Sequence, residues 1–188
     1  MSWIRPPAVA GQFYPATPST LQAMVDEFLA GAAGNGQRCH ALIAPHAGYI
    51  YSGPIAASAY ACLASRREQV RRVVLLGPAH QSPVRGLAAS SAAAWATPLG
   101  NVPLDQETIR ELVVLPQVQL DDQAHAAEHS LEVHLPFLQR VLADFSLVPL
   151  VAGGATPQEV AEVLDYFAGD ETTMLIVSSD LSHYNDYE

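Results

Sequence analysis

Three histidines each follow a short apolar run of the kind that forms a buried strand. His46 and His80 come after the first two such runs, and His183 comes after the last one, together with Asp180. In a parallel α/β sheet the carboxyl ends of the strands share one edge, and ligands bind there. Neutral imidazoles and a carboxylate at one point are ligands of the kind that metal ions take. The sequence therefore predicts one shared site, although each histidine alone is also typical of a hydrogen-bonded residue at a strand end.

A second group of polar residues lies in the stretch HAAEHSLEVH. His125, Glu128 and His129 form the pattern H-x-x-E-H, which also occurs in inverted zinc peptidases. If the stretch is helical, His125 and His129 share a face, and Glu132 lies on the face of Glu128. The pattern is short, so a polar helix face that lines a pocket is favoured over a zinc peptidase. We expect Glu128 and His129 to face the cleft of the other histidines, and His125 to be peripheral.

Helical and strand-like segments alternate along the chain. Apolar residues at helical spacing predict helices over 17–34, 52–66, 104–115, 128–143 and 156–169. Apolar or β-branched runs predict strands over 41–44, 71–77, 145–153 and 173–180, with minor strands at 86–90 and 101–104. The alternation is typical of an α/β fold with a mostly parallel or mixed central sheet that has helices on both faces. There is no repeat and no internal boundary, so we expect a single domain over 1–188.

A few residues predict where helices begin. Ser52 and Asp105 are placed as caps, and Thr156 with Glu159 has the spacing of a capping box. Pro136 lies inside a predicted helix, so it must either kink that helix or mark a new first turn.

Composition excludes several classes of function. The 188 residues carry a formal net charge of −10, which repels phosphate backbones and anionic lipid, so we expect neither nucleic-acid nor membrane binding. There is no run of about 18 apolar residues to span a bilayer, and the first residues lack the apolar core of a secretory signal. The two cysteines, Cys39 and Cys62, make no disulfide framework and fit a reduced compartment. We therefore expect a cytoplasmic protein.

Six motifs in order give the chain a family resemblance. They are PAVAGQFYP, APHAGYIYSG, LLGPAH, TPLGNV, EHSLEVHLPFL and VSSDLSHY, and they extend over residues 5–184. With them the chain resembles the Memo-like family, called AmmeMemoRadiSam system protein B in prokaryotes. That family is similar in fold and metal-site layout to the class III non-haem extradiol dioxygenases, which implies the same kind of α/β fold here.

The resemblance also implies a metal site. His46 and His80 would be ligands, with Fe(II) as the first choice and copper as the alternative. The third ligand of the family is a cysteine in a C-terminal portion, and neither Cys39 nor Cys62 stands at the matching position. We therefore expect this chain to lack that portion of the family. The third ligand would then be Asp180, His183 or water.

Further residues would line the same pocket. The candidate catalytic residues that the resemblance implies are His183, Asp180, His129 and Glu128. His183 would act as the acid/base, because imidazole titrates near working pH, and Asp180 would orient a histidine.

The leading hypothesis is a metal-dependent oxidoreductase with dioxygenase-like activity on an unknown small molecule or peptide. The alternative is a non-catalytic, signalling-type module that binds a peptide or a partner protein. Less favoured is the H-x-x-E-H zinc peptidase. The family name implies radical SAM and AMMECR-type proteins as partners. The apolar strand near the end of the chain predicts a bare face and hence a homo-oligomer.

Overall fold

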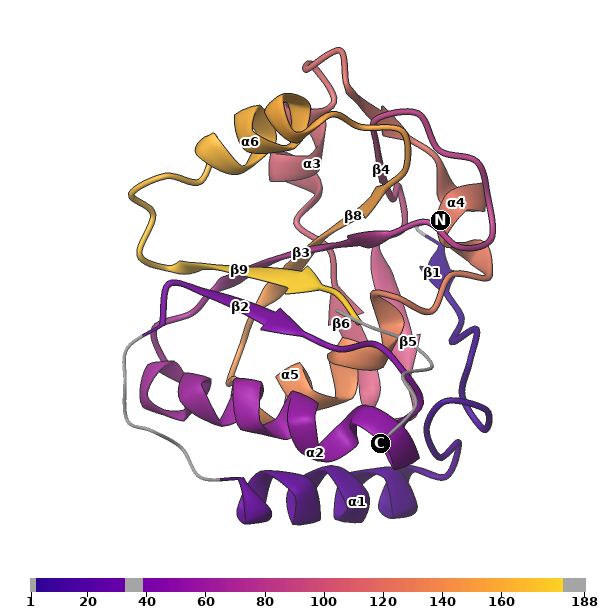
Figure 1. Ribbon diagram of the computed structural model, residues 1–188, viewed down its shortest axis with the longest axis vertical. Helices are drawn as coiled ribbons and strands as arrows, with labels where there is room; N and C mark the ends of the chain where they lie inside the picture. Colours follow the sequence, from indigo (N-terminus) through magenta and orange to yellow (C-terminus); the bar gives the residue numbers. More distant parts are fainter. Residues whose placement is uncertain (1–2, 33–38, 181–188) are drawn as a thin grey trace, which may run out of the picture.

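The computed structural model describes residues 3–32 and 39–180 of the chain. Its centre is a six-stranded sheet with the strand order β2-β9-β3-β8-β4-β7 (Figure 1). These strands are β2 (Ala41–Ala44), β9 (Thr173–Ser178), β3 (Arg72–Pro78), β8 (Ser146–Ala152), β4 (Leu87–Ala89) and β7 (Val118–Leu120). The first four run parallel, β4 is antiparallel to β8, and β7 is parallel to β4. The predicted α/β fold with a mostly parallel or mixed sheet is confirmed.

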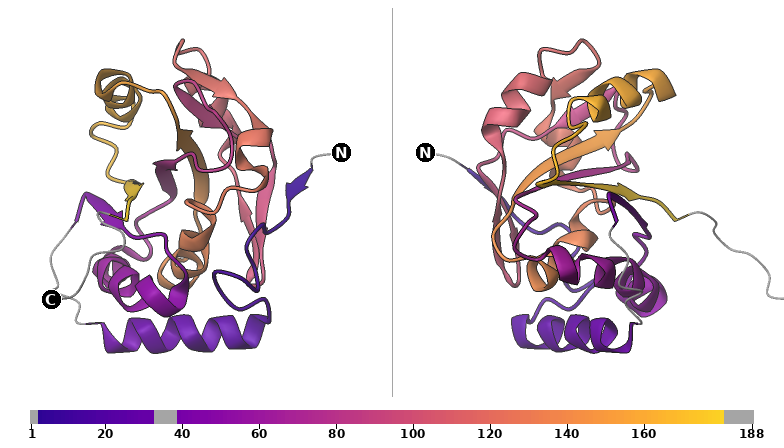
Figure 2. Two further views of the ribbon diagram at one scale, coloured as in Figure 1. Left: turned by 45° about the vertical axis from the view of Figure 1, so that its right-hand side comes forward. Right: turned by 90° about the vertical axis from the view of Figure 1, so that its left-hand side faces the viewer.

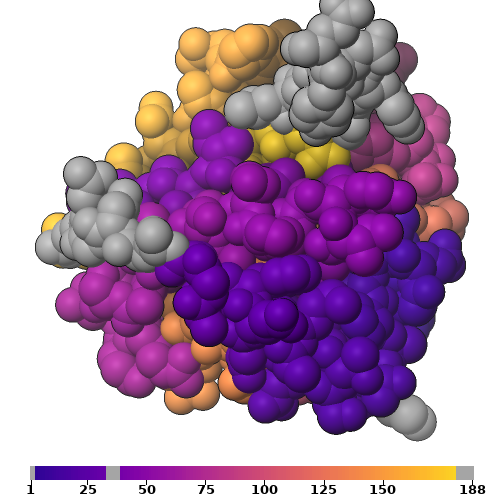
Figure 3. All heavy atoms as spheres, turned by 60° about the horizontal axis from the view of Figure 1, so that its bottom comes forward, coloured from indigo at the N-terminus to yellow at the C-terminus, as the bar shows by residue number. Residues whose placement is uncertain are grey.

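Helices lie on both sides of this sheet (Figures 1 and 2). On one side are α1 (Pro18–Gly31), α2 (Tyr49–Tyr60) and α5 (Leu135–Val141). On the other are α3 (Gln106–Leu112) and α6 (Pro157–Asp165). Seen from below, the surface is formed mainly by α1 and α2 (Figure 3). No helix within 3–32 and 39–180 is long and apolar enough to cross a bilayer.

The strands in the middle of the sheet form the core. Five consecutive residues of β3 and five of β8 are buried. Continuous apolar runs of this kind are typical of strands that are covered on both faces. β9 lies between β2 and β3, as its apolar sequence predicts. This arrangement puts the ends of β2, β3 and β9 beside one another, which is what the site requires.

A smaller sheet packs beside the large one and carries the start of the chain. Its order is β1-β5-β6, with β1 (Ile4–Arg5), β5 (Ala94–Thr97) and β6 (Gly100–Pro103). β1 runs parallel to β5, and β5 runs antiparallel to β6. Both predicted minor strands exist, but they belong to different sheets, since 86–90 contains β4 of the large sheet and 101–104 contains β6 of the small one.

Two predicted caps are confirmed, and of the two alternatives for Pro136 the structure has the new first turn. Asp105 caps α3 by accepting from the Thr108 N–H, Thr156 and Glu159 form a reciprocal capping box on α6, and Pro136 lies in the first turn of α5. The cap predicted at Ser52 is wrong. α2 begins at Tyr49, three residues earlier, with Gly48 as its cap residue, and the Tyr49 N–H donates to the Phe13 carbonyl at 2.8 Å. The Ser52 hydroxyl lies in the first turn and donates to the Ala47 carbonyl.

The stretch from 125 to 134 is not one helix, which corrects the sequence interpretation. α4 (Asp122–Ala126) ends after His125, and a 3₁₀ turn, η2 (Glu132–His134), precedes α5. Between them the Glu128 carboxylate accepts from the N–H groups of His129 and Ser130, at 2.9 Å each. A side chain that bonds to neighbouring N–H groups competes with helical hydrogen bonds. His125 and His129 therefore do not share a helix face.

A buried ion pair fixes this irregular segment to the start of the chain. Arg5 and Glu132 are 1% and 0% exposed, and Nη1 lies 2.6 Å from Oε2. Arg5 also donates to the carbonyls of His125 and Glu128, both at 2.8 Å. Glu132 accepts from Tyr14 and from two N–H groups of the N-terminal segment, and the guanidinium lies 4.3 Å from the Trp95 ring centroid. Both charges are thus hydrogen-bonded, which a buried pair needs in order to be tolerated.

The first prediction concerns this pair. Arg5→Ala leaves the Glu132 carboxylate buried without its counter-charge, so we expect the free energy of unfolding to fall by roughly 3–5 kcal/mol. Urea unfolding monitored by tryptophan fluorescence measures this. Arg67→Ala is the control, because Arg67 is half exposed and its bridge to Glu68 spans 3.8 Å; it should cost less than about 1 kcal/mol. Equal losses of unfolding free energy in the two variants would show that the buried pair stabilises the protein no more than an exposed pair does.

The second prediction concerns an apolar strip at the edge of the sheet. Ile43 is 61% exposed, and its partner in register, Val177, is only half-buried. Exposed apolar strips promote association, and the expected homo-oligomer remains a prediction. If this strip is the contact between copies, Ile43→Lys should lower the mean mass measured by light scattering. Ile55→Lys is the matched control, since Ile55 lies on α2 and is exposed to a similar extent, 65%. A monomeric unmodified chain, or an effect of the Ile55 change alone, would contradict the assignment.

Candidate metal centre

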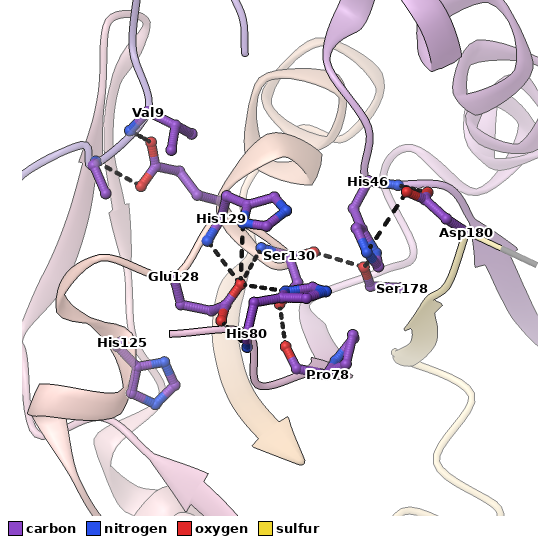
Figure 4. Close-up of polar contacts among 12 residues, drawn as sticks. Val9, His46, Pro78, His80, His125, Glu128, His129, Ser130, Ser178 and Asp180 are labelled. Carbon is purple, nitrogen blue, oxygen red and sulfur yellow. Dashed lines mark hydrogen bonds and ion pairs between the residues drawn. The ribbon is translucent and has the colours of Figure 1, made fainter. Parts of the chain in front are cut away.

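Three imidazoles meet at the carboxyl edge of the sheet. His46 follows β2, His80 follows β3, and His129 lies in the irregular segment before η2 (Figure 4). One ring nitrogen of each lies within 4.8 Å of the others, so the three could hold one metal ion. The ring centroids of His80 and His129 are 4.6 Å apart and stacked, and His46 meets both edge-on. The side chains are 4%, 35% and 15% exposed for His46, His80 and His129, so the cluster opens mainly at His80.

The hydrogen bonds of His46 show which of its nitrogens is free. Nδ1 lies 2.6 Å from the Ser178 hydroxyl oxygen, and that hydroxyl donates to the Ser130 carbonyl, also at 2.6 Å. A carbonyl only accepts, so the single hydroxyl proton is committed to Ser130. Ser178 must then accept from Nδ1–H, and the lone pair of neutral His46 is on Nε2.

Glu128 fixes the position of the ring proton of His80 in a similar way. Its carboxylate accepts from the His80 N–H at 2.6 Å and contacts Nδ1 at 2.9 Å. It also lies 3.3 Å from Nδ1 of His129. An ionised carboxylate is acceptor-only, so Nδ1 of His80 carries the proton and Nε2 is left for a metal. A histidine ligand whose other nitrogen is held by a carboxylate is a recurrent arrangement in metal sites.

The pKa values of Glu128, His46 and His129 favour the protonation states that bind a cation. Burial alone would raise the pKa of Glu128, but hydrogen bonds from the His80 side chain, the His80 N–H and the Ser130 N–H outweigh it and lower the pKa to about 2. Burial lowers the pKa of His46 to about 4, against the opposing effect of Asp180. Burial also lowers the pKa of His129. Near neutral pH the carboxylate is charged while His46 and His129 are neutral, which is the state that binds metal.

Asp180 lies beside His46 at the end of β9. Its Oδ1 accepts from the His46 N–H at 2.6 Å, and its Oδ2 is 3.7 Å from Nε2. The position suits the predicted role in orienting a histidine, and that role stays a prediction. His183, the predicted acid/base, lies outside the described residues, so its expected place in the cluster also stays a prediction.

His125 is separate from the cluster. It is fully buried, its Nε2 donates to the Ala88 carbonyl at 3.1 Å, and its ring packs edge-on against Trp95. The expectation that it would be peripheral is confirmed. Since His125 is not among the clustered ligands and does not share a helix with His129, the H-x-x-E-H pattern does not form a peptidase site.

Sequence reasoning misassigned the role of one residue at the histidine cluster and missed two others. His129 was expected as a candidate catalytic residue in the pocket and not as a metal ligand, yet it supplies the third nitrogen of the cluster. Ser178, which contacts His46, and Phe13, whose ring centroid is 4.5 Å from that of His129, were not singled out. Both lie within quoted motifs, PAVAGQFYP and VSSDLSHY, so the motifs were the available signal.

The fold and the cluster together define an α/β protein with an extradiol dioxygenase-like fold and a three-histidine group at the sheet edge. The family model described as "Memo-like protein" matches residues 5–188. The chain belongs to this family.

Relatives agree with this assignment. A "MEMO1 family protein" of Nitrosopumilus maritimus is 34% identical over 194 residues, which cover 97% of this chain and 70% of the relative. Another of Aquifex aeolicus is 39% identical over 186 residues (96% and 68%). A third, of Methanopyrus kandleri, is 40% identical over 200 residues (98% and 70%).

The third prediction concerns acid sensitivity. Burial lowers the pKa of His125 to about 4 and that of His134 to about 3. Below pH 6.5 the unfolded chain takes up protons on these rings that the native chain does not, so stability falls as the pH drops from about 6.5 towards 4. Each ring contributes up to about 1.4 kcal/mol per pH unit in that range. Urea unfolding at pH 7, 6 and 5 measures the slope.

A variant isolates one of the rings. His125→Gln keeps an N–H donor for the Ala88 carbonyl but cannot be protonated. Below pH 6.5 the free energy of unfolding of this variant should depend less steeply on pH, because about one proton fewer is taken up on unfolding. A slope that is unchanged by this substitution would mean that His125 already titrates normally in the folded protein.

Proposed function

We propose that this protein binds one redox-active metal ion through His46, His80 and His129 and serves as a non-haem, dioxygenase-like oxidoreductase. The observation that carries the proposal is the convergence of three ring nitrogens within 4.8 Å. It is supported by the partners of Nδ1 in His46 and His80, which leave both Nε2 atoms free to bind.

The donor set suits a first-row transition metal. Imidazole nitrogen binds iron, copper and zinc, whereas magnesium and calcium prefer oxygen. Fe(II) is the proposed ion because the family resembles extradiol dioxygenases, and copper is the alternative because it binds such sites more tightly. When bound, iron or copper would provide open coordination positions and one-electron chemistry.

The chain's own residues would prepare the site. Glu128 holds His80 through two hydrogen bonds and places negative charge behind the imidazoles. Phe13 covers the ring of His129 and keeps water from that side. Asp180 holds the backbone of His46, and His183 is proposed to exchange a proton with the substrate, since imidazole titrates near neutral pH.

A non-catalytic module that binds a peptide or partner protein is the second candidate. The observation that favours it is a group of exposed apolar side chains on α2. Ile50, Tyr51 and Ile55 are 76%, 79% and 65% exposed. Radical SAM and AMMECR-type proteins remain proposed partners on the basis of the family resemblance. Such a module would tolerate the loss of the histidine cluster.

The fourth prediction separates these candidates. Protein purified without oxygen should bind one equivalent of Fe(II) or Cu(II), measured by elemental analysis and metal titration. His80→Gln and His129→Gln should each lower the affinity by at least about 100-fold, since losing a ligand should exceed the 10–100-fold cost of losing an outer partner. His125→Gln, outside the cluster, should keep the affinity. Unmodified protein without metal affinity, or His129→Gln that binds normally, would refute the three-histidine site.

A further inference from the structure

Two buried serines link the three histidine-bearing segments. Ser130 and Ser178 are 0% and 2% exposed, and neither belongs to the metal-binding group. The Ser178 hydroxyl lies between Nδ1 of His46 and the Ser130 carbonyl, at 2.6 Å from each. It accepts from the ring and donates to the carbonyl, so its hydrogen-bonding direction is set by Ser130.

Ser130 is itself held at three points. Its N–H donates to Glu128 at 2.9 Å, its hydroxyl donates to the Pro78 carbonyl at 2.8 Å, and its carbonyl accepts from Ser178. Pro78 is the last residue of β3, two residues before His80. One residue thus connects the strand of His80, the carboxylate that orients His80, and the hydroxyl that orients His46.

The space around the two serines is closed. A Cβ atom added at Gly77 would lie 2.7 Å from Leu131, 3.0 Å from Cβ of Ser178 and 3.2 Å from Oγ of Ser130. A side chain at this position would require Leu131 to shift, so glycine is the residue that fits the strand without rearrangement. The two serines and Gly77 are therefore closely packed against one another.

Asp180 favours the opposite tautomer of His46. Its Oδ2 is 3.7 Å from Nε2, so a proton on Nε2 would face a carboxylate oxygen. Without an acceptor at Nδ1, that placement would be preferred, and the lone pair on Nε2 would be lost. The hydroxyl of Ser178 is the described group that holds the proton on the other nitrogen.

We propose that Ser178, fixed by the carbonyl of Ser130, is a positioning residue that keeps His46 in the Nδ1–H tautomer and so leaves Nε2 for the metal ion. This inference rests on the proposed metal site. It adds a device within that site which sets the donor atom of one ligand.

The fifth prediction tests the tautomer in the metal-free protein. Histidine labelled with ¹⁵N is observed by long-range proton–nitrogen NMR at pH 8, where imidazole is neutral. The His46 signal is the one that disappears in His46→Gln. The unmodified protein should show Nδ1–H, and Ser178→Ala should shift His46 towards Nε2–H. Metal affinity should fall by about 10–100-fold, as is typical for loss of such an outer partner.

Two controls separate positioning from general damage. Ser130→Ala removes the hydroxyl that bonds to Pro78 but keeps the main-chain carbonyl, so His46 should remain Nδ1–H. Ser58→Ala removes an exposed hydroxyl that donates to the Pro54 carbonyl, and it should change neither the tautomer nor the affinity.

The outcomes distinguish this inference from the proposed function. His46 found as Nε2–H in the unmodified protein overturns the inference, and this result does not depend on whether Ser178→Ala folds. A Ser178→Ala protein with an unchanged tautomer and affinity also overturns it. If the tautomer responds as expected but the unmodified protein binds no iron or copper, the positioning stands and the proposed metal function fails.

Discussion

The buried pair of Arg5 and Glu132 is the constraint on which the site depends. An arginine offers a rigid fork of donors, and here the fork reaches a carboxylate and two carbonyls of one irregular segment. One of those carbonyls belongs to Glu128, the residue whose side chain orients His80. The start of the chain therefore sets the position of a segment more than a hundred residues away, and the small sheet is part of the support of the metal centre.

From that segment, one carboxylate organises most of the cluster. Glu128 accepts from the backbone of two separate segments, since its donors come from His80 in one and from His129 and Ser130 in the other. These bonds keep it ionised despite burial, so negative charge lies behind neutral imidazoles. A cation that enters would find nitrogen donors on one side and a counter-charge on the other.

Much of the fold could be predicted from the sequence, and the limits have physical causes. Apolar runs and their alternation with helices predict the sheet, and the rule for strand ends predicts that His46 and His80 meet. The shape of 125–134 could not be predicted, because its spacing is helical but Glu128 takes the N–H groups that a helix would use. That choice depends on His80, 48 residues earlier, and on Arg5. Contacts between distant segments of this kind leave no local pattern.

The two oriented imidazoles differ as donors. A charged partner at Nδ1 raises the basicity of a histidine ligand, and Glu128 does this for His80. His46 instead has a neutral hydroxyl at Nδ1, and that hydroxyl is already polarised towards the Ser130 carbonyl. His80 is therefore the stronger donor and His46 the weaker one.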